Sequence, residues 1–374
     1  MSQSRTPPIS RFLRVLPALA ALAAPLFGAE PARPDHWVFQ IELSSRYDSN
    51  ITELSNKDRD RVDDAACQSS PTCVSRFRIE SPDDVIFSPS ARIEWSNRTA
   101  NRVETSVRAD ARTNLYARNS IKNYETYALR LAQDLTPARE YETTLSLRGE
   151  WTPDFYLREL TVPEASLMAG TTIRDSARYS SNDYRAALRQ VLAPKHLEAE
   201  VSYGRDTRDY DSPFDERDGD LSGWGAELTL SLGDHRVASL RAGYRNESYD
   251  ADGDQPGTAA VEPDISSDRE TVGLGCLVRW GHERRGSLSL SVERETRDFR
   301  SRDTADVFHF GREDTRTQER LEFRQPMGQR FYLEIGLEHE QNDSHLGPSA
   351  GSTTGDEVTD YTRNIASIST GWRF

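Results

Sequence analysis

Arginine and glutamate recur at every second or fourth position along several stretches of this 374-residue chain. Arg108 and Arg112 are spaced in this way, and so are Glu198 and Glu200. Side chains two residues apart in an extended strand point to the same face, so each stretch would present its charged groups in a row. Such rows can bind or select charged solutes, or they can cross-link the wall that carries them through charge-assisted hydrogen bonds.

The sequence contains no pattern of residues that is typical of an enzyme active site. His196, His235 and His282 fall in short predicted turns. No histidine shares a charged strand face with a serine and an orienting acid, as a nucleophile and its base require. Glu340 and Asp343 could act as a pair of catalytic carboxylates, but acidic residues are so numerous that chance accounts for such a pair. We therefore predict that the chain is not an enzyme and holds no cofactor.

A metal site is not expected either. Asp250, Asp252 and Asp254 have the spacing that opens a calcium-binding loop. Gln255 stands where that loop needs glycine, and no bidentate glutamate closes it. We interpret the acidic segments as solvated loops, whose carboxylates divalent cations could bridge to lipopolysaccharide.

The first residues predict export. Three arginines precede a short apolar run from Val15 to Ala24, and small residues follow it. This is the pattern of a secretory signal peptide. We assign the signal to residues 1–29 and a single domain to 30–374.

The three cysteines fit an exported protein. Cys67 and Cys73 share one polar segment, and in an oxidising compartment they are expected to form a disulfide. Cys276 lies on an apolar strand face instead, where it is expected to pack as a small hydrophobic residue.

Composition narrows the protein class further. The chain has 47 Lys and Arg against 61 Asp and Glu, for a net charge of −14. Its arginines alternate with apolar residues instead of forming a basic patch, which excludes a nucleic-acid-binding function. No segment after residue 29 approaches 18 apolar residues, which excludes a helical membrane protein. A β-barrel remains compatible, because its lipid-facing surface takes only every second residue of each strand.

Alternation of apolar and polar residues, which is typical of a two-faced strand, recurs along the chain. For example, Leu333, Ile335 and Leu337 alternate with Glu334 and Glu338. The pattern predicts fourteen strands. They span residues 37–47, 84–97, 102–116, 123–135, 141–153, 183–192, 197–208, 222–232, 237–249, 269–280, 287–299, 313–325, 331–342 and 360–374.

The predicted connections alternate between short turns and long loops. Turns such as 97–101 and 326–330 are rich in Pro, Gly or Asn, whereas the long segments include 48–83 and 154–182. Short periplasmic turns and long extracellular loops are the arrangement of an outer-membrane barrel, and an even strand count places both termini on the periplasmic side. A soluble sandwich has no reason to sort its loops in this way. We therefore predict an all-β fold, a transmembrane antiparallel up-and-down β-barrel of about 14 strands.

The two faces of the predicted strands differ in polarity. One is apolar and carries tryptophans near its ends, as lipid-facing strands do. The other carries ions, which at this density only a water-filled lumen accommodates, because a buried unpaired charge costs several kcal/mol. Strand parity assigns pore-lining candidates to a positive and a negative wall. The positive wall comprises Arg108, Arg112, Arg130, Arg148, Arg185, Arg189 and Arg241, and the negative wall comprises Glu198, Glu200, Glu227, Glu334 and Glu338.

A wet, charged lumen predicts a porin-like channel for small hydrophilic or anionic solutes in the outer membrane of a Gram-negative bacterium. Its expected partners are outer-membrane lipid, lipopolysaccharide and the solute. The alternative is a closed barrel, in which the charged rows interlock and the protein has a structural or surface-interaction role. The sequence leaves the substrate and the register between strands open.

The final strand resembles the closing strand of outer-membrane barrels. From Ser367 to Phe374 it alternates strictly and ends on an aromatic residue. The resemblance implies that barrel-assembly machinery recognises this strand.

A second resemblance lies at the exit of the first strand. The segment from Tyr47 to Ile51, Tyr-Asp-Ser-Asn-Ile, is similar to an opening motif of the β-barrel porin-2 group, which is linked to exopolysaccharide export loci. Barrels of the surface lipoprotein assembly modifier family share the motif but place helical repeats before it, for which this sequence has no room after residue 29. The resemblance to the porin-2 group implies solute transport or a polysaccharide-associated role.

Overall fold

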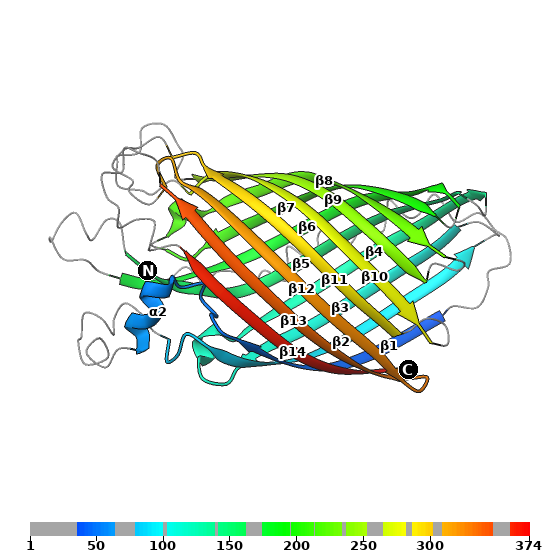
Figure 1. Cartoon of the computed structure of the whole chain (residues 1–374), viewed down its shortest axis with the longest axis horizontal. Coiled ribbons are helices and arrows are strands. Elements are labelled where there is room, and N and C mark those ends of the chain that lie inside the picture. The colour runs from blue at the N-terminus through cyan, green and yellow to red at the C-terminus, as the bar shows by residue number, and fades with distance from the viewer. Residues whose placement is uncertain are drawn as a thin grey trace, which may run out of the picture.

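Fourteen antiparallel strands form a closed barrel, in which each strand pairs with its neighbours in sequence and β14 pairs with β1. The structure, a computed structural model, describes residues 36–63, 79–99, 103–138, 141–161, 174–194, 196–212, 214–233, 237–252, 265–281, 286–301, 309–346 and 360–374. Figure 1 shows the strands crossing the wall with a common tilt. The predicted up-and-down barrel of 14 strands is confirmed.

The strands lie close to their predicted positions. They are β1 (His36–Asp48), β2 (Asp84–Thr99), β3 (Val103–Tyr116), β4 (Tyr124–Ala138), β5 (Tyr141–Thr161), β6 (Arg174–Ala193), β7 (Leu197–Tyr210), β8 (Gly219–Leu232), β9 (Ala238–Ala251), β10 (Ser267–Trp280), β11 (Gly286–Phe299), β12 (Glu313–Met327), β13 (Phe331–His345) and β14 (Tyr361–Arg373). The described connections also contain α2 (Asn56–Asp63), η2 (Ser120–Lys122) and η3 (Asp215–Arg217).

The hairpin of β5 and β6 is longer than predicted. A loop was expected over 154–182, but β5 continues to Thr161 and β6 begins at Arg174. Between Thr152 and Arg158 the register with β6 shifts twice, which marks β-bulges. Each bulge adds a residue and locally disrupts the alternation of the strand, so the period-two pattern breaks although the strand continues.

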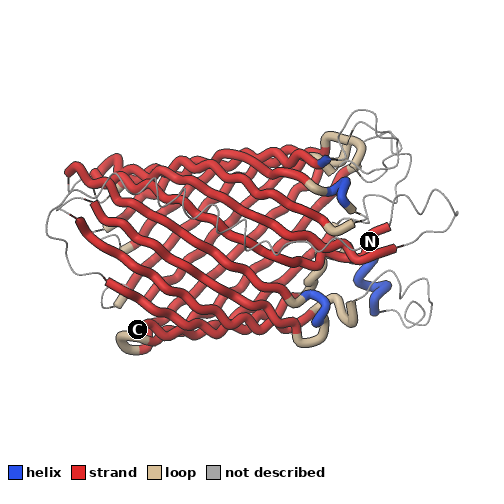
Figure 2. Tube along the Cα trace, turned by 180° about the vertical axis from the view of Figure 1, so that it is seen from behind, coloured by secondary structure: helices blue, strands red, loops and turns tan. Residues whose placement is uncertain are grey.

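Short connections lie at one end of the barrel and long connections at the other. From Thr99 to Val103 the chain makes a short turn between β2 and β3, whereas from Asp48 to Asp84 it makes a long excursion between β1 and β2. The ends with short and long connections are termed the turn-side rim and the loop-side rim. β1 begins and β14 ends at the turn-side rim, and α2 lies beyond the loop-side rim (Figures 1 and 2).

The outer face of the barrel is apolar around its circumference. Large hydrophobic side chains are exposed on every strand, and Leu274 and Val201 expose 64% and 58% of their surface. A water-soluble protein rarely exposes so continuous an apolar surface, whereas a barrel in lipid requires one. The strands are therefore membrane-spanning. None of the described helices is long and apolar enough to cross a membrane.

Aromatic residues gather near both edges of the apolar band. Near the turn-side rim Trp280 packs against Phe323, with ring centroids 5.7 Å apart. Toward the loop-side rim Trp224 packs against Tyr244 at 5.4 Å. Belts of this kind mark the two membrane–water interfaces.

The wall continues beyond the apolar band on the loop side. The outward side chains there are polar: Arg205 binds Asp220 at 2.7 Å, and the ring of His339 lies 2.8 Å from the Asn364 amide oxygen. On the loop side the barrel wall therefore projects from the lipid. This band of outward polar side chains, which includes Arg205, Asp220, His339 and Asn364, is termed the polar collar.

A buried ion pair joins β1 to β14 at the loop-side end of their seam. Asp48 is fully buried and accepts hydrogen bonds from Nη2 and Nε of Arg363 at 2.6 and 3.0 Å. Asp48 also accepts the backbone N–H of Asn50 at 3.0 Å, and the Asn50 side chain bonds both backbone polar groups of Leu54. The motif predicted to be a strand exit therefore also fastens the two strands that close the barrel.

Some predictions fall on segments outside the described residues. These are the signal peptide at 1–29, the Cys67–Cys73 disulfide and most of the acidic loop that follows Asp252. Cys276 is described, and its thiol is exposed on the outer apolar face, as its strand parity predicted.

Candidate functional site

Three cavities formed by described residues lie on the interior face of the barrel and have volumes of about 560, 400 and 370 Å³. Most of the predicted pore-lining residues border them. The largest is lined by Arg185, Glu200, Glu227, Arg241 and Glu334, the second by Arg108, Arg112, Arg130 and Arg148, and the third by Glu338. The remaining two, Arg189 and Glu198, face each other at 3.9 Å.

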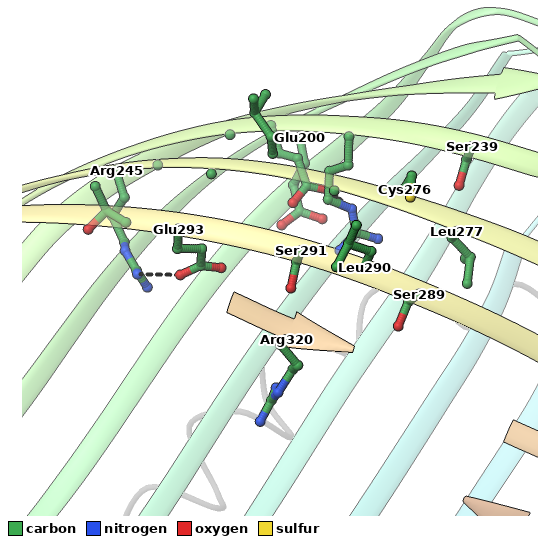
Figure 3. A pocket seen from close by; sticks show the side chains of 18 of the residues that line it. Glu200, Ser239, Arg245, Cys276, Leu277, Ser289, Leu290, Ser291, Glu293 and Arg320 are labelled. Carbon is green, nitrogen blue, oxygen red and sulfur yellow. Dashed lines mark ion pairs between the residues drawn. The ribbon is translucent and has the colours of Figure 1, made fainter. Parts of the chain in front are cut away.

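Ion pairs between strands line the largest cavity. Arg241 of β9 lies 3.1 Å from Glu227 of β8. In Figure 3, Arg245 and Glu293 are joined by an ion pair, 4.0 Å long, and Arg320 projects from β12. The Arg241 side chain is 59% exposed, so water reaches these groups. Pairs this wet contribute about 0–1 kcal/mol each and leave their charges available to a solute.

Four arginines from consecutive strands stand at one level of the opposite wall. Arg108 is the direct cross-strand partner of Arg130, Arg130 of Arg148, and Arg148 of Arg185. These four residues, from β3 to β6, are termed the arginine row. Like charges directly opposite each other destabilise a sheet, so the row needs water or counter-charges to persist.

The counter-charges around the arginine row are incomplete. Asp110 accepts a hydrogen bond from Nε of Arg108 at 2.7 Å. It also accepts one from Nε of Arg92, which lies outside the row, at 2.6 Å. Arg148 pairs with Glu150, and Arg185 lies 3.3 Å from Glu200. Arg130 is exposed.

No described residue forms an ion pair with Arg130. The row therefore contains one guanidinium group that no described carboxylate pairs with, and three of its four members, Arg108, Arg130 and Arg148, line the second cavity. Sequence parity identified all four arginines but could not show that they are adjacent, because register is not readable from one strand.

Aromatic side chains at the loop-side rim form a small core. Tyr210 and Phe214 pack with Ala177 and are almost fully buried. The Arg208 guanidinium lies between Tyr179 and Tyr249, 5.5 and 5.6 Å from their ring centroids. These rings stabilise the ends of β6 to β9, and their burial removes them as a surface on which a sugar could stack.

Asp218 lies at the loop-side rim, at the end of η3 and outside the membrane-spanning strands. Burial raises the pKa of its carboxyl to about 6, and the negative charges of Asp209, Asp215 and Asp252 act in the same direction. The backbone N–H of Tyr210, which donates a hydrogen bond to the carboxylate, opposes the shift.

We expect this carboxyl to make the rim more stable in mild acid. A carboxyl whose folded-state pKa exceeds its unfolded value, here 3.8, binds its proton more tightly in the folded state. The stability of the segment should therefore rise as pH falls from about 7 through 6 toward 4. Asp218→Asn should protect the Tyr210 amide from hydrogen exchange at neutral pH and abolish that pH dependence, whereas Asp343→Asn, an exposed control, should do neither. Equal protection factors in wild type and Asp218→Asn at pH 7 would contradict this assignment.

The residues considered for catalysis lie apart. Glu340 points inward and accepts the Tyr361 hydroxyl at 2.6 Å, whereas Asp343 is exposed and bonds Gln341. Glu340 and Asp343 do not form a carboxylate pair, because an odd spacing on a strand sends them to opposite faces. Within the described ranges, no group of three or more His, Cys, Asp or Glu is arranged to hold a metal ion.

Comparison with known proteins does not assign this chain to a family. No protein-family model matches the sequence, and no curated protein is similar to it in sequence. Membership of the porin-2 group stays a prediction.

Several solved outer-membrane barrels are similar at low identity. The monoaromatic hydrocarbon channel CymD aligns over 90% of this chain and 88% of its own, with 11% identity and a TM-score of 0.47. An anion-selective porin from Comamonas acidovorans aligns over 92% and 100%, with 11% identity and a TM-score of 0.42. A bacterial polysaccharide outer membrane secretin aligns over 89% and 98%, with 10% identity and a TM-score of 0.42.

Proposed function

We propose that this protein is an outer-membrane channel of a Gram-negative bacterium that passes small hydrophilic solutes passively and favours anionic ones. Residues 1–29 would direct its export, and barrel-assembly machinery would recognise the closing strand that ends at Phe374. The polar collar and the loop-side rim would then face lipopolysaccharide at the cell surface.

The arginine row carries this proposal. Its residues are direct cross-strand partners on β3 to β6, and Arg148 and Arg185 each expose about half of the side chain, 52% and 50%. Fourteen strands about 4.8 Å apart and tilted by about 40° enclose a lumen roughly 28 Å across between backbones. Long side chains narrow such a lumen without filling it. Positive charge on one wall would then lower the energy of an anion at this level.

The resemblance to the porin-2 group would add saccharides or exopolysaccharide segments to the transported solutes. Small anions fit this proposal better than sugars, because the rim rings Tyr210 and Tyr249 expose only 3% and 2% of their surface. Tyr124, which borders the second cavity, is one ring on which a sugar could stack, and most other contacts to a sugar would come from charged side chains.

The competing function is a closed, structural barrel, and the ion pairs of the lumen wall are the observation that favours it. Its charged rows would interlock, and removing one partner would leave a buried charge at a cost of about 3–5 kcal/mol. In an open channel the same pairs are screened by water and contribute about 0–1 kcal/mol each.

Replacing both Arg148 and Arg189 by serine separates the two functions. We expect single-channel conductance and ion selectivity in planar bilayers to change, while heat-modifiable migration on gels stays nearly unaltered, because both side chains are wet. Arg294→Ser, on the outward face of β11, is the matched control and should change neither property. Unchanged conductance together with a large loss of stability would defeat the channel proposal and establish the structural one.

A further inference from the structure

Four side-chain donors without acceptors gather near the loop-side ends of β10 and β11. They are Ser267 Oγ, Arg269 Nε and Thr271 Oγ1 of β10, and Arg297 Nε of β11. Each atom is buried and makes no hydrogen bond. These four residues are termed the donor cluster. Buried polar atoms without a protein partner are rare in native proteins, and four in one place leave donors for water or for a bound ligand to satisfy.

The register brings the donor cluster together on the interior face. Arg269 and Arg297 are direct cross-strand partners. Ser267 and Thr271 stand two residues before and after Arg269, so the three side chains of β10 share one face. The alternate residues Val272 and Leu274 are exposed on the apolar outer face, at 54% and 64%, whereas Ser267 and Thr271 are buried, so the face of the donor cluster is the inward one.

The nearby carboxylates are each engaged by another arginine. Glu247, opposite Arg269 in the register, lies 3.6 Å from Arg245. Glu295, opposite Thr271, binds Arg316 at 2.8 Å.

The same holds on the other side of Arg297. Asp314 is its cross-strand partner on β12, but it binds Arg312 through Nη2 at 2.6 Å and through Nε at 2.7 Å. Within the described part of the chain, no ion pair includes Arg269 or Arg297. Two adjacent guanidinium groups are thus left without counter-charge, with two hydroxyl groups beside them.

We propose that the donor cluster is a binding site for a small oxyanion, the phosphate or carboxylate group of a solute in the lumen. Planar guanidinium groups match such oxygens in charge and geometry, and the Ser267 and Thr271 hydroxyls supply neutral donors. The site faces the lumen, which distinguishes its ligand from a lipid headgroup on the outer face. It goes beyond the proposed channel, because oxyanion binding here does not require that the lumen conducts.

The probe is inorganic phosphate, titrated calorimetrically into the refolded full-length barrel in detergent at constant ionic strength. We expect saturable binding to the wild type and an affinity at least tenfold weaker in Arg269→Gln/Arg297→Gln, since each lost charge-assisted hydrogen bond costs about tenfold and the variant loses the charge of two arginines. Arg294→Gln, the same change on the outward face of β11, should bind like the wild type. Acetate in place of phosphate tests the carboxylate arm, and addition of lipopolysaccharide should leave phosphate binding unchanged.

Stability without ligand gives a second, independent readout. In chloride buffer the double variant should unfold at the same or a higher temperature than the wild type, because a like-charged pair has been removed. Absence of saturable phosphate and acetate binding to the wild type would overturn the proposal, as would equal weakening by Arg294→Gln. A lower unfolding temperature of the double variant in chloride would show that the two arginines serve the fold instead. Conductance measurements test the channel proposal alone. Whether the barrel conducts or not, the phosphate-binding result stands independently.

Discussion

Replacing Arg130 and Arg148 by glutamate is expected to reverse the ion selectivity of the lumen from anions to cations. Both are neighbours in the arginine row, and Arg130 has no ion-pair partner among the described residues. The double substitution replaces two positive charges by two negative ones at a single level of the lumen. At about 0.1 M salt the screening length is about 10 Å, so a charge on the wall still acts on an ion well inside the lumen.

The reversal potential in a potassium chloride gradient measures this effect. The permeability ratio of chloride to potassium should lie above one for the wild type and below one for the variant, and the difference should shrink at about 1 M salt. Arg294→Glu, which makes the same charge change on the outward face, should keep the wild-type ratio. If the ratio does not move in the Arg130→Glu/Arg148→Glu barrel, the row lies outside the ion pathway.

Asp48→Asn is expected to destabilise the barrel by about 1–3 kcal/mol. The substitution keeps the shape of the side chain but removes the carboxylate that makes the two closest hydrogen bonds to the Arg363 guanidinium, whose side chain is 16% exposed. Arg363 is then left with its longer ion pairs, to Glu53 at 3.2 Å and to Glu340 at 3.8 Å. The loss falls on the β1–β14 seam, where the barrel closes. Unfolding in urea, followed by the mobility difference of folded and unfolded protein on gels, measures it.

A double-mutant cycle separates the ion pair from general damage. Arg363→Met together with Asp48→Asn should cost much less than the sum of the two single changes, because residues in contact are coupled. Asp343→Asn, at an exposed position of β13, should leave stability within about 0.5 kcal/mol of the wild type. Additive effects of the two seam substitutions would show that Asp48 and Arg363 stabilise the barrel independently.

The strands were predictable because lipid-facing and lumen-facing residues alternate along every strand of a membrane barrel. Leu333, Ile335 and Leu337 face outward and Glu334 and Glu338 inward, as their alternation indicated. The same rule failed where the backbone departs from regular pairing. Bulges in β5 break the alternation, so part of the β5–β6 hairpin was predicted as a loop.

The sites depend on register, which one sequence does not contain. Arg108, Arg130, Arg148 and Arg185 were all assigned to the lumen wall, yet only strand pairing shows that they stand side by side. A shift of one residue between two strands would move a whole set of side chains to the other face. The donor cluster was missed for the same reason, since Arg269 and Arg297 are 28 positions apart in sequence and adjacent only across β10 and β11.

The motif at the end of β1 was recognised but its physical role was not. Asp48 and Asn50 have the composition of turn residues, and they do organise the backbone up to Leu54. Their partner Arg363 lies on the last strand. The sequence signal that could have identified it is the single arginine on the inward face near the start of the predicted strand 360–374.

Single-channel recording of the wild-type barrel in planar bilayers tests the central claim most directly. With potassium chloride at about 0.1 M on one side and about tenfold more on the other, where the dilute side retains a screening length of about 10 Å, discrete conductance steps should appear. Their reversal potential should have the sign of chloride preference. Protein that is correctly folded on gels but shows no steps, or steps that prefer potassium, would contradict the account.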